Sequence, residues 1–447
     1  MSVHPIEYRY FTKEMKDIFN EENKLAKWLK VEAALARAHA EVGNISEENA
    51  AEIEKKADIK IVKLSRVKEI EKEIDHDIMA MVRGLSEVCK GDAGKYVHLG
   101  ATSYDIVDTA WSLILKDALE LILKRVITLK SLLLKWAEKH KSTICIGRTH
   151  GQHAVPTTYG MKFALFGSEI YRHENRLKMV IEKNLVGKMS GAVGTMASFG
   201  DKGFQIQKKV MKYLRLKESP ISNQIIQRDY HAEIFSFLAL IGATLSKIAK
   251  EIRNLQRTEI GELFEPYGKS KQVGSSTMAA KRNPHKSERI CGLYRVLEGQ
   301  LITVFNNAAL IEHERDLTNS ASERVVFPET FILLDYMLTQ MIKIIDGLEF
   351  NLNNIKKNID LTKGQIFAEN IMIKLVEKGL NRQEAHEKLR EIAIACRDQD
   401  ISYKQGILND DVLKNLISLE DLDAWLDPKN YIGTAVKQVE NIIKECK

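Results

Sequence analysis

Residues 271–288 read KQVGSSTMAAKRNPHKSE, and the rest of the chain is interpreted outward from this stretch. Gly274 frees the backbone at its start, Ser275 and Ser276 supply hydroxyls, and Lys281 supplies a cation. Hydroxyls, an ammonium group and exposed amides on one flexible loop suit a carboxylate whose charge grows during a reaction. The same composition fits a linker between two helices, with solvated lysines, equally well.

The composition is typical of a helical protein. Only 7 prolines occur in 447 residues, and the long proline-free tracts are rich in Leu, Ile, Lys, Glu and Ala. Apolar periodicity predicts long helices, which cover residues 22–42, 106–141, 158–184, 235–255 and 331–350. From about residue 361, shorter helices are expected to alternate with turns.

Charge, cysteine and hydropathy patterns argue against several classes of protein. The net charge is +6, but the chain has no basic tail, so nucleic acid is not an expected partner. A modest positive charge instead favours small anionic substrates. The five cysteines are odd in number and lack CxxC spacing, as expected in a reducing cytoplasm. No signal peptide is recognisable, and no run approaches the roughly 18 apolar residues of a membrane span.

The opening stretch resembles a family signature. Lyases of the fumarase/aspartase superfamily carry Gly-Ser-Ser-x-Met-Pro-x-Lys-x-Asn-Pro. The matching positions are Gly274, Ser275, Ser276, Met278, Lys281, Asn283 and Pro284. The chain departs from the signature at Ala279, where proline is usual. This change makes the loop more flexible and removes no chemical group.

Two N-terminal segments resemble the adenylosuccinate lyase family within this superfamily. Arg9 and Tyr10 resemble a pair that contacts the nucleotide, and Asp75, His76 and Asp77 resemble a His-Asp motif of the active site. From the residues alone, two other interpretations stay open. The first pair reads as a surface arginine beside a packing tyrosine. The second group reads as a helix-surface histidine in an acidic patch.

A glycine turn precedes the predicted helix 106–141. Thr102 and Ser103 can cap that helix, which accounts for them without any further role. The segment resembles the superfamily's first conserved region, whose hydroxyls bind a substrate carboxylate. The resemblance then places His98 near the substrate phosphate.

His150 lies in the string GRTHGQH, where Gly147 and Gly151 indicate a turn. His150 and His153 can be read as a metal pair, but no third ligand follows at suitable spacing, so we predict no metal. The string resembles the superfamily's Arg-Thr-His-Gly-Gln region. In adenylosuccinate lyases this histidine is the general acid, and Thr149 lies beside it.

Two further segments resemble the same family. Gln224 belongs to a Gln-x-x-Gln-Arg-Asp segment and is expected to contact the substrate, whereas Arg228 and Asp229 can equally be a structural pair at a helix start. Ser320 and Arg324 match a Ser-x-x-Glu-Arg element that holds the substrate phosphate, for which a forked guanidinium is well suited. A surface loop is the simpler reading of that element.

The resemblance implies an all-α fold with three domains at residues 1–108, 109–360 and 361–447, the second carrying loop 271–288. It implies a homotetramer with a twenty-helix core and active sites shared between three chains. The implied reaction is loss of fumarate from adenylosuccinate and from its ribotide analogue SAICAR. No cofactor is implied, and a cytoplasmic location is expected.

The resemblance also implies a role for each matched residue. Ser275 is the base, His150 the acid, Glu288 orients the acid, and Lys281 stabilises developing charge. The implied substrate-binding residues are Arg9, Tyr10, Asp75, His76, Asp77, His98, Thr102, Ser103, Thr149, Gln224, Ser276, Met278, Asn283, Ser320 and Arg324.

Two alternatives to this function stay open. The first is another lyase of the superfamily, such as argininosuccinate lyase, aspartase or a 3-carboxymuconate cycloisomerase. Arg324 and the Arg9–Tyr10 pair favour a phosphorylated nucleotide over these substrates. The second is a helical scaffold without catalytic activity, against which the joint presence of Ser275 and His150 argues.

Overall fold

The computed structural model describes residues 3–268, 277–278 and 280–446. Helices make up most of this part of the chain, and the strands are short. The predicted all-α class is therefore confirmed. Gly274, Ser275, Ser276 and Ala279 lie outside the described residues.

The chain divides into two compact units. Unit 1 falls within Met1–Ile127, Arg172–Ser246 and Ile290–Gln340, and unit 2 falls within Thr128–Tyr171, Lys247–Arg289 and Met341–Lys447. Five long helices contribute residues to both units: α7 (Ser103–Lys139), α8 (Tyr159–Lys183), α10 (Asp229–Leu255), α11 (His285–Ala309) and α12 (Thr318–Asp346).

Long helices lie at each of the predicted ranges, but two of them start earlier than predicted: α10 at Asp229, ahead of residue 235, and α12 at Thr318. The sequence analysis began this helix at residue 331 and treated Ser320 and Arg324 as loop residues, which is wrong. Asp316 Oδ1 accepts a hydrogen bond from Thr318 N at 2.9 Å and so caps the helix earlier. The helix continues through Pro328, since burial of Phe327 and Phe331 on either side outweighs the unfavourable proline.

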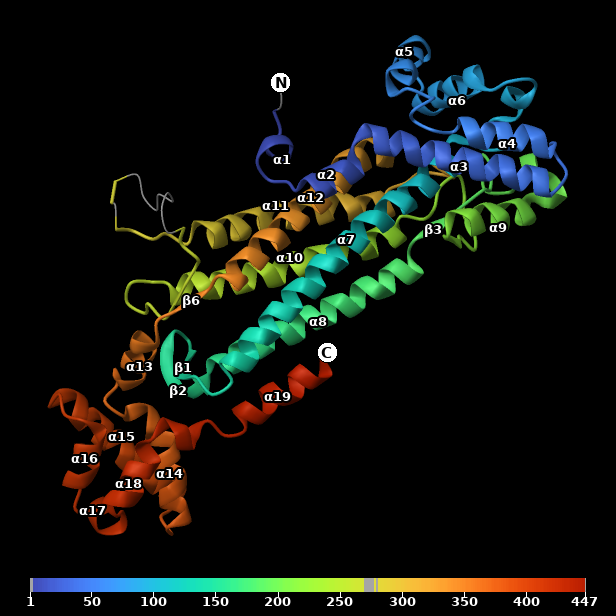
Figure 1. Ribbon diagram of the computed structural model, residues 1–447. Coiled ribbons are helices and arrows are strands. Elements are labelled where there is room, and N and C mark those ends of the chain that lie inside the picture. Colours follow the sequence, from blue (N-terminus) through green and yellow to red (C-terminus); the bar gives the residue numbers. More distant parts are fainter. Residues whose placement is uncertain (1–2, 269–276, 279, 447) are drawn as a thin grey trace. The chain divides into compact units, whose positions relative to one another are not determined.

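In unit 1, short helices surround one apolar cluster (Figure 1). α3 (Glu21–Glu41) packs against α4 (Glu47–Lys56) and α9 (Gly203–Leu214), while α5 (Leu64–Ile74) packs against α6 (Asp77–Val88). Leu25, Leu29 and Ala36 recur on one face of α3 and are buried in the cluster. The other elements confined to unit 1 are α1 (Pro5–Tyr8), α2 (Lys13–Phe19), β3 (Val186–Gly187), β4 (Lys217–Glu218) and the 3-10 helices η1 (Ala93–Tyr96) and η2 (Ala197–Lys202).

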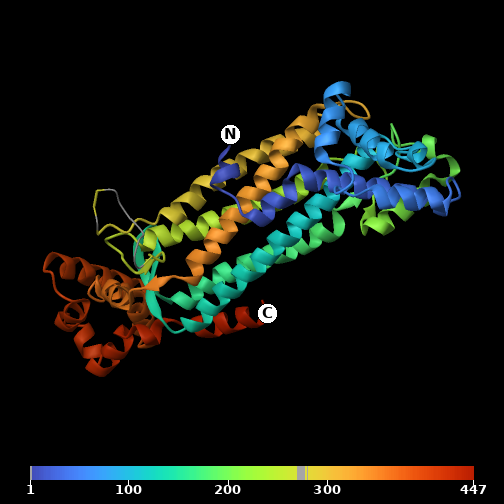
Figure 2. The same cartoon turned by 45° about the horizontal axis from the view of Figure 1, so that its top comes forward.

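Unit 2 contains a β-hairpin and a C-terminal group of short helices, as predicted after residue 361 (Figure 2). β1 (Ile144–Thr149) pairs antiparallel with β2 (Gln152–Thr158), and β5 (Leu263–Phe264) pairs antiparallel with β6 (Glu349–Phe350). The C-terminal helices share an apolar cluster that includes Ile371. The helices after β6 are α13 (Leu352–Asp360), η3 (Gln365–Phe367), α14 (Ala368–Glu377), α15 (Arg382–Asp398), α16 (Tyr403–Asn409), α17 (Leu413–Leu416), α18 (Leu419–Leu426), η4 (Pro428–Tyr431) and α19 (Ala435–Glu445).

Helices α10 and α12 are long and apolar enough to cross a membrane by length and composition alone. The sequence analysis expected no such segment. In the described chain, 61% of the most apolar window of α10 and 67% of that of α12 are buried, as is usual for core helices of soluble proteins.

Candidate active site

His150 occupies the turn of the hairpin formed by β1 and β2. Thr149 pairs with Gln152, so the turn consists of His150 and Gly151, whose φ angles are +54° and +77°. Positive φ at both positions is the pattern of a type I′ turn, whose twist matches that of the flanking strands. Both His150 and Thr149 are exposed. The predicted turn is confirmed, and it presents the His150 imidazole at the tip of a rigid hairpin.

His153 follows on β2 and has a different environment from His150. It is half-buried and lies opposite Arg148 of β1. Burial lowers the pKa of His153, and the nearby charge of Arg148 lowers it further. His153 is therefore neutral near pH 7. Among the described residues, no group of three or more His, Cys, Asp or Glu side chains is arranged to hold a metal ion.

The described end of the 271–288 loop lines a cavity of about 730 Å³ in unit 2. Lys281 and Glu288 are exposed and Asn283 is partly buried at its wall, while Met278 is exposed and does not line it. The cavity is strongly basic, and its cations are Lys250, Arg253, Arg257, Lys281 and Arg282. A basic wall of this kind suits a ligand with two carboxylates.

α11 begins immediately after Pro284, a residue well suited to the start of a helix. In its first turn, the Ser287 backbone N–H donates to Glu265 Oε1 at 2.6 Å. The Glu265 carboxylate occupies the N-terminus of the helix, where the helix dipole stabilises a negative charge. Glu265 therefore fixes the turn of α11 that carries Glu288.

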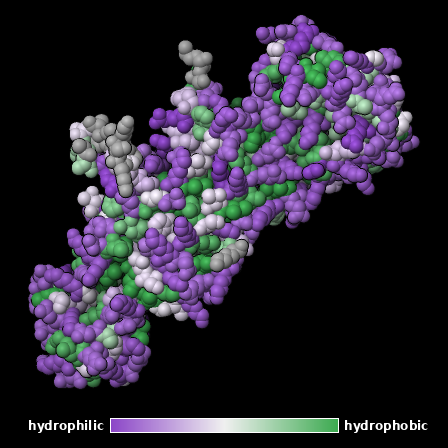
Figure 3. Space-filling model, in the orientation of Figure 1, coloured by the Kyte–Doolittle hydropathy of each residue, from purple (hydrophilic) through white to green (hydrophobic). Residues whose placement is uncertain are grey.

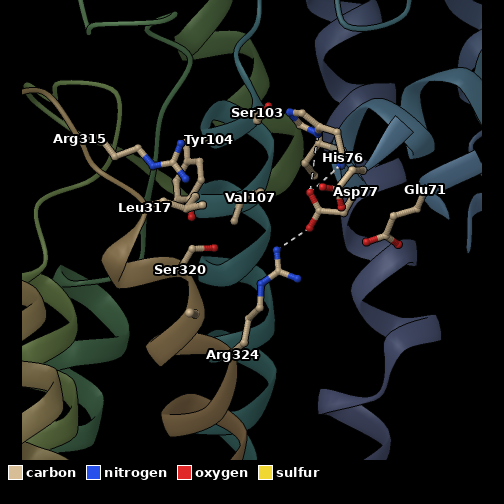
Figure 4. Close-up of a pocket in the computed structure, with 13 residues that line it drawn as sticks. Glu71, His76, Asp77, Ser103, Tyr104, Val107, Arg315, Leu317, Ser320 and Arg324 are labelled. Carbon is tan, nitrogen blue, oxygen red and sulfur yellow. Dashed lines mark hydrogen bonds and ion pairs between the residues drawn. The ribbon is translucent and has the colours of Figure 1, made fainter. Parts of the chain in front are cut away.

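A second cavity of about 410 Å³ lies in unit 1 (Figure 4). It is bounded by the turn between α5 and α6, the start of α7 and the start of α12. Figure 4 shows Arg324 pointing toward Asp77, with Tyr104 and Arg315 on the opposite side from His76. The predicted substrate-binding residues that line it are Asp75, His76, Asp77, Ser103, Ser320 and Arg324.

The turn between α5 and α6 owes its geometry to two of these residues. Asp75 ends α5 with a left-handed φ of +51°, and the His76 side chain then caps α6 by accepting from Met79 N at 3.3 Å. With Nδ1 acting as an acceptor, Nε2 carries the ring proton. Asp77 Oδ1 lies 3.9 Å from the same ring nitrogen.

Tyr104 and Arg315 line this cavity and were missed by the sequence analysis. The Arg315 guanidinium stacks 3.7 Å from the centre of the Tyr104 ring, and it donates to Gln224 Oε1 at 2.9 Å. Gln224 Nε2 donates to the Ala192 carbonyl at 3.0 Å. Gln224 thus orients Arg315 and does not itself line the cavity. No recognisable spacing in the sequence marked Arg315.

Lys24 is another cation that the sequence analysis missed. It lines a small cavity that shares Tyr104, Ser320 and Arg324 with the larger one. Burial lowers the pKa of Lys24, and the charge of Arg324 adds to this effect. Two cations so close together favour an anion between them.

Thr102 and His98 lie next to the start of α7 without lining either cavity. Thr102 N donates to Asp105 Oδ2 at 2.9 Å, so the Asp105 carboxylate satisfies a backbone N–H just before α7. His98 Nδ1 lies 2.6 Å from Oε1 of the buried Glu32. Burial lowers the pKa of His98, but the Glu32 carboxylate outweighs burial, so the net effect is a raised pKa.

Asp105 anchors the start of α7 through a buried ion pair that the sequence analysis missed. Its Oδ1 accepts from Lys188 Nζ at 2.5 Å and from Ser190 N at 2.9 Å, and both charged side chains are fully buried. Its Oδ2 accepts from Gly191 N at 3.1 Å. This pair fixes the loop 187–195 against the start of α7.

Arg9 and Tyr10 line neither cavity. Arg9 is exposed and donates to Tyr10 Oη at 3.2 Å, and the Tyr10 ring packs 5.6 Å from the Tyr336 ring. The described part of the chain therefore brings some of the predicted residues to two cavities and a hairpin turn. It leaves six of them outside these places: Arg9, Tyr10, His98, Thr102, Gln224 and Met278. Ser275 and Ser276 lie outside the described residues.

The chain is similar in sequence to known lyases. A family model described as "Lyase" matches residues 7–299, and one described as "Adenylosuccinate lyase C-terminus" matches residues 364–442. The adenylosuccinate lyase of Pyrococcus abyssi is 57% identical over 443 residues, covering 99% of this chain and 98% of the relative. That of Methanocaldococcus jannaschii is 52% identical over 447 residues, covering 100% and 96%.

The chain belongs to the adenylosuccinate lyase family.

Solved structures share the fold of this family. A 3-carboxy-cis,cis-muconate lactonizing enzyme from Pseudomonas putida is 32% identical, with a TM-score of 0.90 and coverage of 99% of this chain and 98% of that one. A fumarate lyase from Mesorhizobium sp. BNC1 is 30% identical, with a TM-score of 0.89 and coverage of 97% and 98%. The fold is thus shared with a lactonizing enzyme, whereas the model matched at residues 364–442 is described as the C-terminus of adenylosuccinate lyase.

Proposed function

We propose that this lyase releases fumarate from adenylosuccinate, giving AMP, and from SAICAR, giving AICAR. The observation that carries the proposal is the 57% identity to an adenylosuccinate lyase over essentially the whole of both chains. The two cavities add physical support. One is rich in cations, and the other combines the Arg324 guanidinium with hydroxyls and a histidine.

The reaction is an anti β-elimination. Ser275, as an alkoxide, removes a proton from the carbon next to a carboxylate. The resulting electron pair forms the carbon–carbon double bond of fumarate as the carbon–nitrogen bond breaks, and His150 protonates the departing nitrogen. Lys281 and Asn283 stabilise the extra negative charge on the carboxylate in the intermediate. Glu288 orients His150 and favours its protonated form.

Separate groups hold the two ends of the substrate. Thr102, Ser103, Thr149 and Gln224 hold the succinyl carboxylates, and Ser276 and Met278 complete this side from the loop. Asp75, His76, Asp77 and His98 border the nucleotide. Arg9, Tyr10, Ser320 and Arg324 hold the nucleotide and its phosphate, for which the forked guanidinium of Arg324 gives a bidentate partner.

Fumarate release tests the proposal directly. The purified chain is mixed with adenylosuccinate or SAICAR, and fumarate formation is followed by ultraviolet absorbance. Argininosuccinate, aspartate and 3-carboxymuconate serve as competing substrates in the same assay. Turnover of the two succinylated purine ribotides alone supports the proposal, and turnover of one of the competitors alone refutes it.

We also propose a homotetramer whose active sites combine residues of three chains. Apolar surface is exposed along the long helices on the face shown in Figure 3. Exposed apolar side chains on α11 and α12 include Val296, Ile302, Phe305 and Val325. Contacts between copies of the chain would remove such side chains from water. Sedimentation analysis tests the assembly, and a monomer at micromolar concentration refutes it.

The remaining assignments follow from the same family. We propose a cytoplasmic enzyme without cofactor or metal, acting on a small molecule without a nucleic-acid or membrane partner, in which the cysteines stay reduced. The division into domains at residues 1–108, 109–360 and 361–447 also remains a proposal. Limited proteolysis that cuts in the segment before α7 and in the segment after α13 supports this division.

A further inference from the structure

Glu262 is a buried carboxylate at the centre of unit 2, and no step of the proposed reaction uses it. Its side chain is completely shielded from solvent. Three polar groups donate to it: Arg148 Nη2 and Tyr159 Oη at 2.5 Å each, and Asn358 Nδ2 at 2.7 Å. A buried carboxylate is tolerated only with such partners. Its position therefore depends on these partners, and theirs on it.

One of the donors lies on the hairpin that carries His150, and another follows it directly. Arg148 lies on β1, two residues before His150, and Tyr159 is the first residue of α8, immediately after β2 ends at Thr158. One carboxylate thus holds β1 and the residue that follows β2. Burial raises the pKa of Tyr159 and the Glu262 charge raises it further, so the phenol keeps its proton and donates.

Glu262 is itself held in place by backbone contacts. Its N–H donates to the Leu255 carbonyl at 3.0 Å, and its carbonyl accepts from Asn351 N at 3.0 Å. The preceding carbonyl, of Gly261, accepts from Asn354 Nδ2 at 3.1 Å. The residue that follows, Leu263, is in the β5–β6 ladder. The carboxylate is therefore a fixed point against which the hairpin is set.

The same segment holds the end of the 271–288 loop. Gln256 Nε2 donates to the Arg282 carbonyl at 2.8 Å, and Gln256 Oε1 accepts from Glu265 N at 2.9 Å. Glu265 in turn accepts from Ser287 N at 2.6 Å. Residues 256–265 thus contact both elements of unit 2 that carry proposed catalytic groups.

We infer that Glu262 is a positioning residue that fixes His150 for proton transfer to the departing nitrogen. The inference rests on the proposed function of His150 as the acid. His150 has a positive φ angle, which is unfavourable for a residue with a Cβ atom, and it is exposed to solvent. The hairpin therefore has to be held in place by contacts elsewhere along it. An error of about 1 Å in the position of a catalytic group can cost about a hundredfold in rate.

The substitution Glu262→Gln keeps the size of the side chain and removes its charge. An amide offers one oxygen as an acceptor and turns an N–H₂ group toward a donor. Arg148 then loses its counter-charge, while its Nη1 is already buried without a partner in the described chain. We expect kcat to fall about ten- to hundredfold, with KM changed less than about threefold.

A double-mutant cycle separates positioning from a general loss of structure. Adenylosuccinate turnover is measured with enzyme in excess for wild type, Glu262→Gln, His150→Ala and the double variant. If Glu262 acts through His150, Glu262→Gln costs less than about twofold in the His150→Ala background. An equal loss in both backgrounds, or a wild-type kcat for Glu262→Gln, overturns the inference.

Two further experiments complete the test: a control for stability, and a measurement that does not depend on catalytic activity. Ile371 lies in the apolar cluster that also contains Ile146 of β1. Ile371→Val destabilises the core of the same unit without removing a contact of Glu262, so it should keep kcat within about twofold. Hydrogen exchange should accelerate over residues 144–158 in Glu262→Gln and stay unchanged over 364–442. Unchanged hydrogen exchange at the hairpin in Glu262→Gln overturns the inference about Glu262, whether or not the wild-type enzyme releases fumarate. Failure of the wild-type enzyme to release fumarate refutes only the proposed function.

Discussion

Arg324 donates to the Asp77 carboxylate at 2.5 Å, which joins the start of α12 to the start of α6 across the wall of the unit 1 cavity. The Arg324 side chain is half exposed, so the pair is weakened by solvent. A phosphate carries more charge than one carboxylate and accepts both arms of a guanidinium. We therefore interpret the pair as a resting contact, which a substrate phosphate replaces.

Replacement of Arg324 should weaken binding of phosphorylated substrate. Hydrogen bonds to charged groups contribute about 1.5–3 kcal/mol, so Arg324→Met should raise KM about ten- to hundredfold. The measurement compares adenylosuccinate with the same compound lacking its phosphate, on which the variant should show no penalty. Arg66→Met, which removes an exposed arginine paired with Glu87, is the control. An equal penalty on both compounds would argue against phosphate binding at Arg324.

The pair of Lys188 and Asp105 should dominate the stability of the start of α7. Both side chains are fully buried, and removal of one partner from a buried pair costs about 3–5 kcal/mol. Lys188→Met should therefore lower the free energy of unfolding by this amount. Denaturant unfolding at fixed protein concentration measures the change. Lys95→Met, at an exposed pair with Asp92, should change it by less than about 1 kcal/mol.

Local features of the sequence predicted the helices and the His150 turn. Apolar periodicity marks a helix within a few turns of chain, and Gly151 beside His150 identifies a hairpin turn. The start of α12 was misplaced because apolar periodicity alone marked residues 331–350, whereas the helix also includes the more polar residues from Thr318 onward. Local rules therefore locate elements better than their ends.

Contacts between distant residues could not be predicted in this way. Asp105 and Lys188 are 83 positions apart, and Arg228 binds Asp108 and Glu323, which are 120 and 95 positions away. The sequence analysis paired Arg228 with its neighbour Asp229, and its actual partners are these two buried carboxylates. Helical periodicity identifies the apolar face of each helix, but it does not identify the other helix that packs against that face. Glu262 escaped notice for the same reason.

The two proposed proton-transfer residues should be separable from folding. Ser275→Ala removes the base and His150→Ala removes the acid, so each should reduce fumarate release to a small fraction of the wild-type rate. His150 is exposed, so its replacement by alanine removes no buried packing. Circular dichroism should therefore match wild type for His150→Ala. Near-normal turnover of Ser275→Ala would exclude this residue as the base.

The ion pair of His98 and Glu32 should make stability depend on pH in a defined direction. Burial opposes protonation of His98, but the Glu32 carboxylate outweighs it and raises the pKa above the ordinary value of 6.5. A raised histidine pKa gives a stabilisation that is complete below the unfolded value and is lost as pH rises through the folded value. The free energy of unfolding of wild type should therefore exceed that of His98→Asn by more at about pH 5.5 than at about pH 8.5. His153→Asn provides a control of opposite sign, because burial lowers the pKa of His153 and its contribution is lost as pH falls. A difference between wild type and His98→Asn that does not change between these pH values would show that Glu32 does not favour protonated His98.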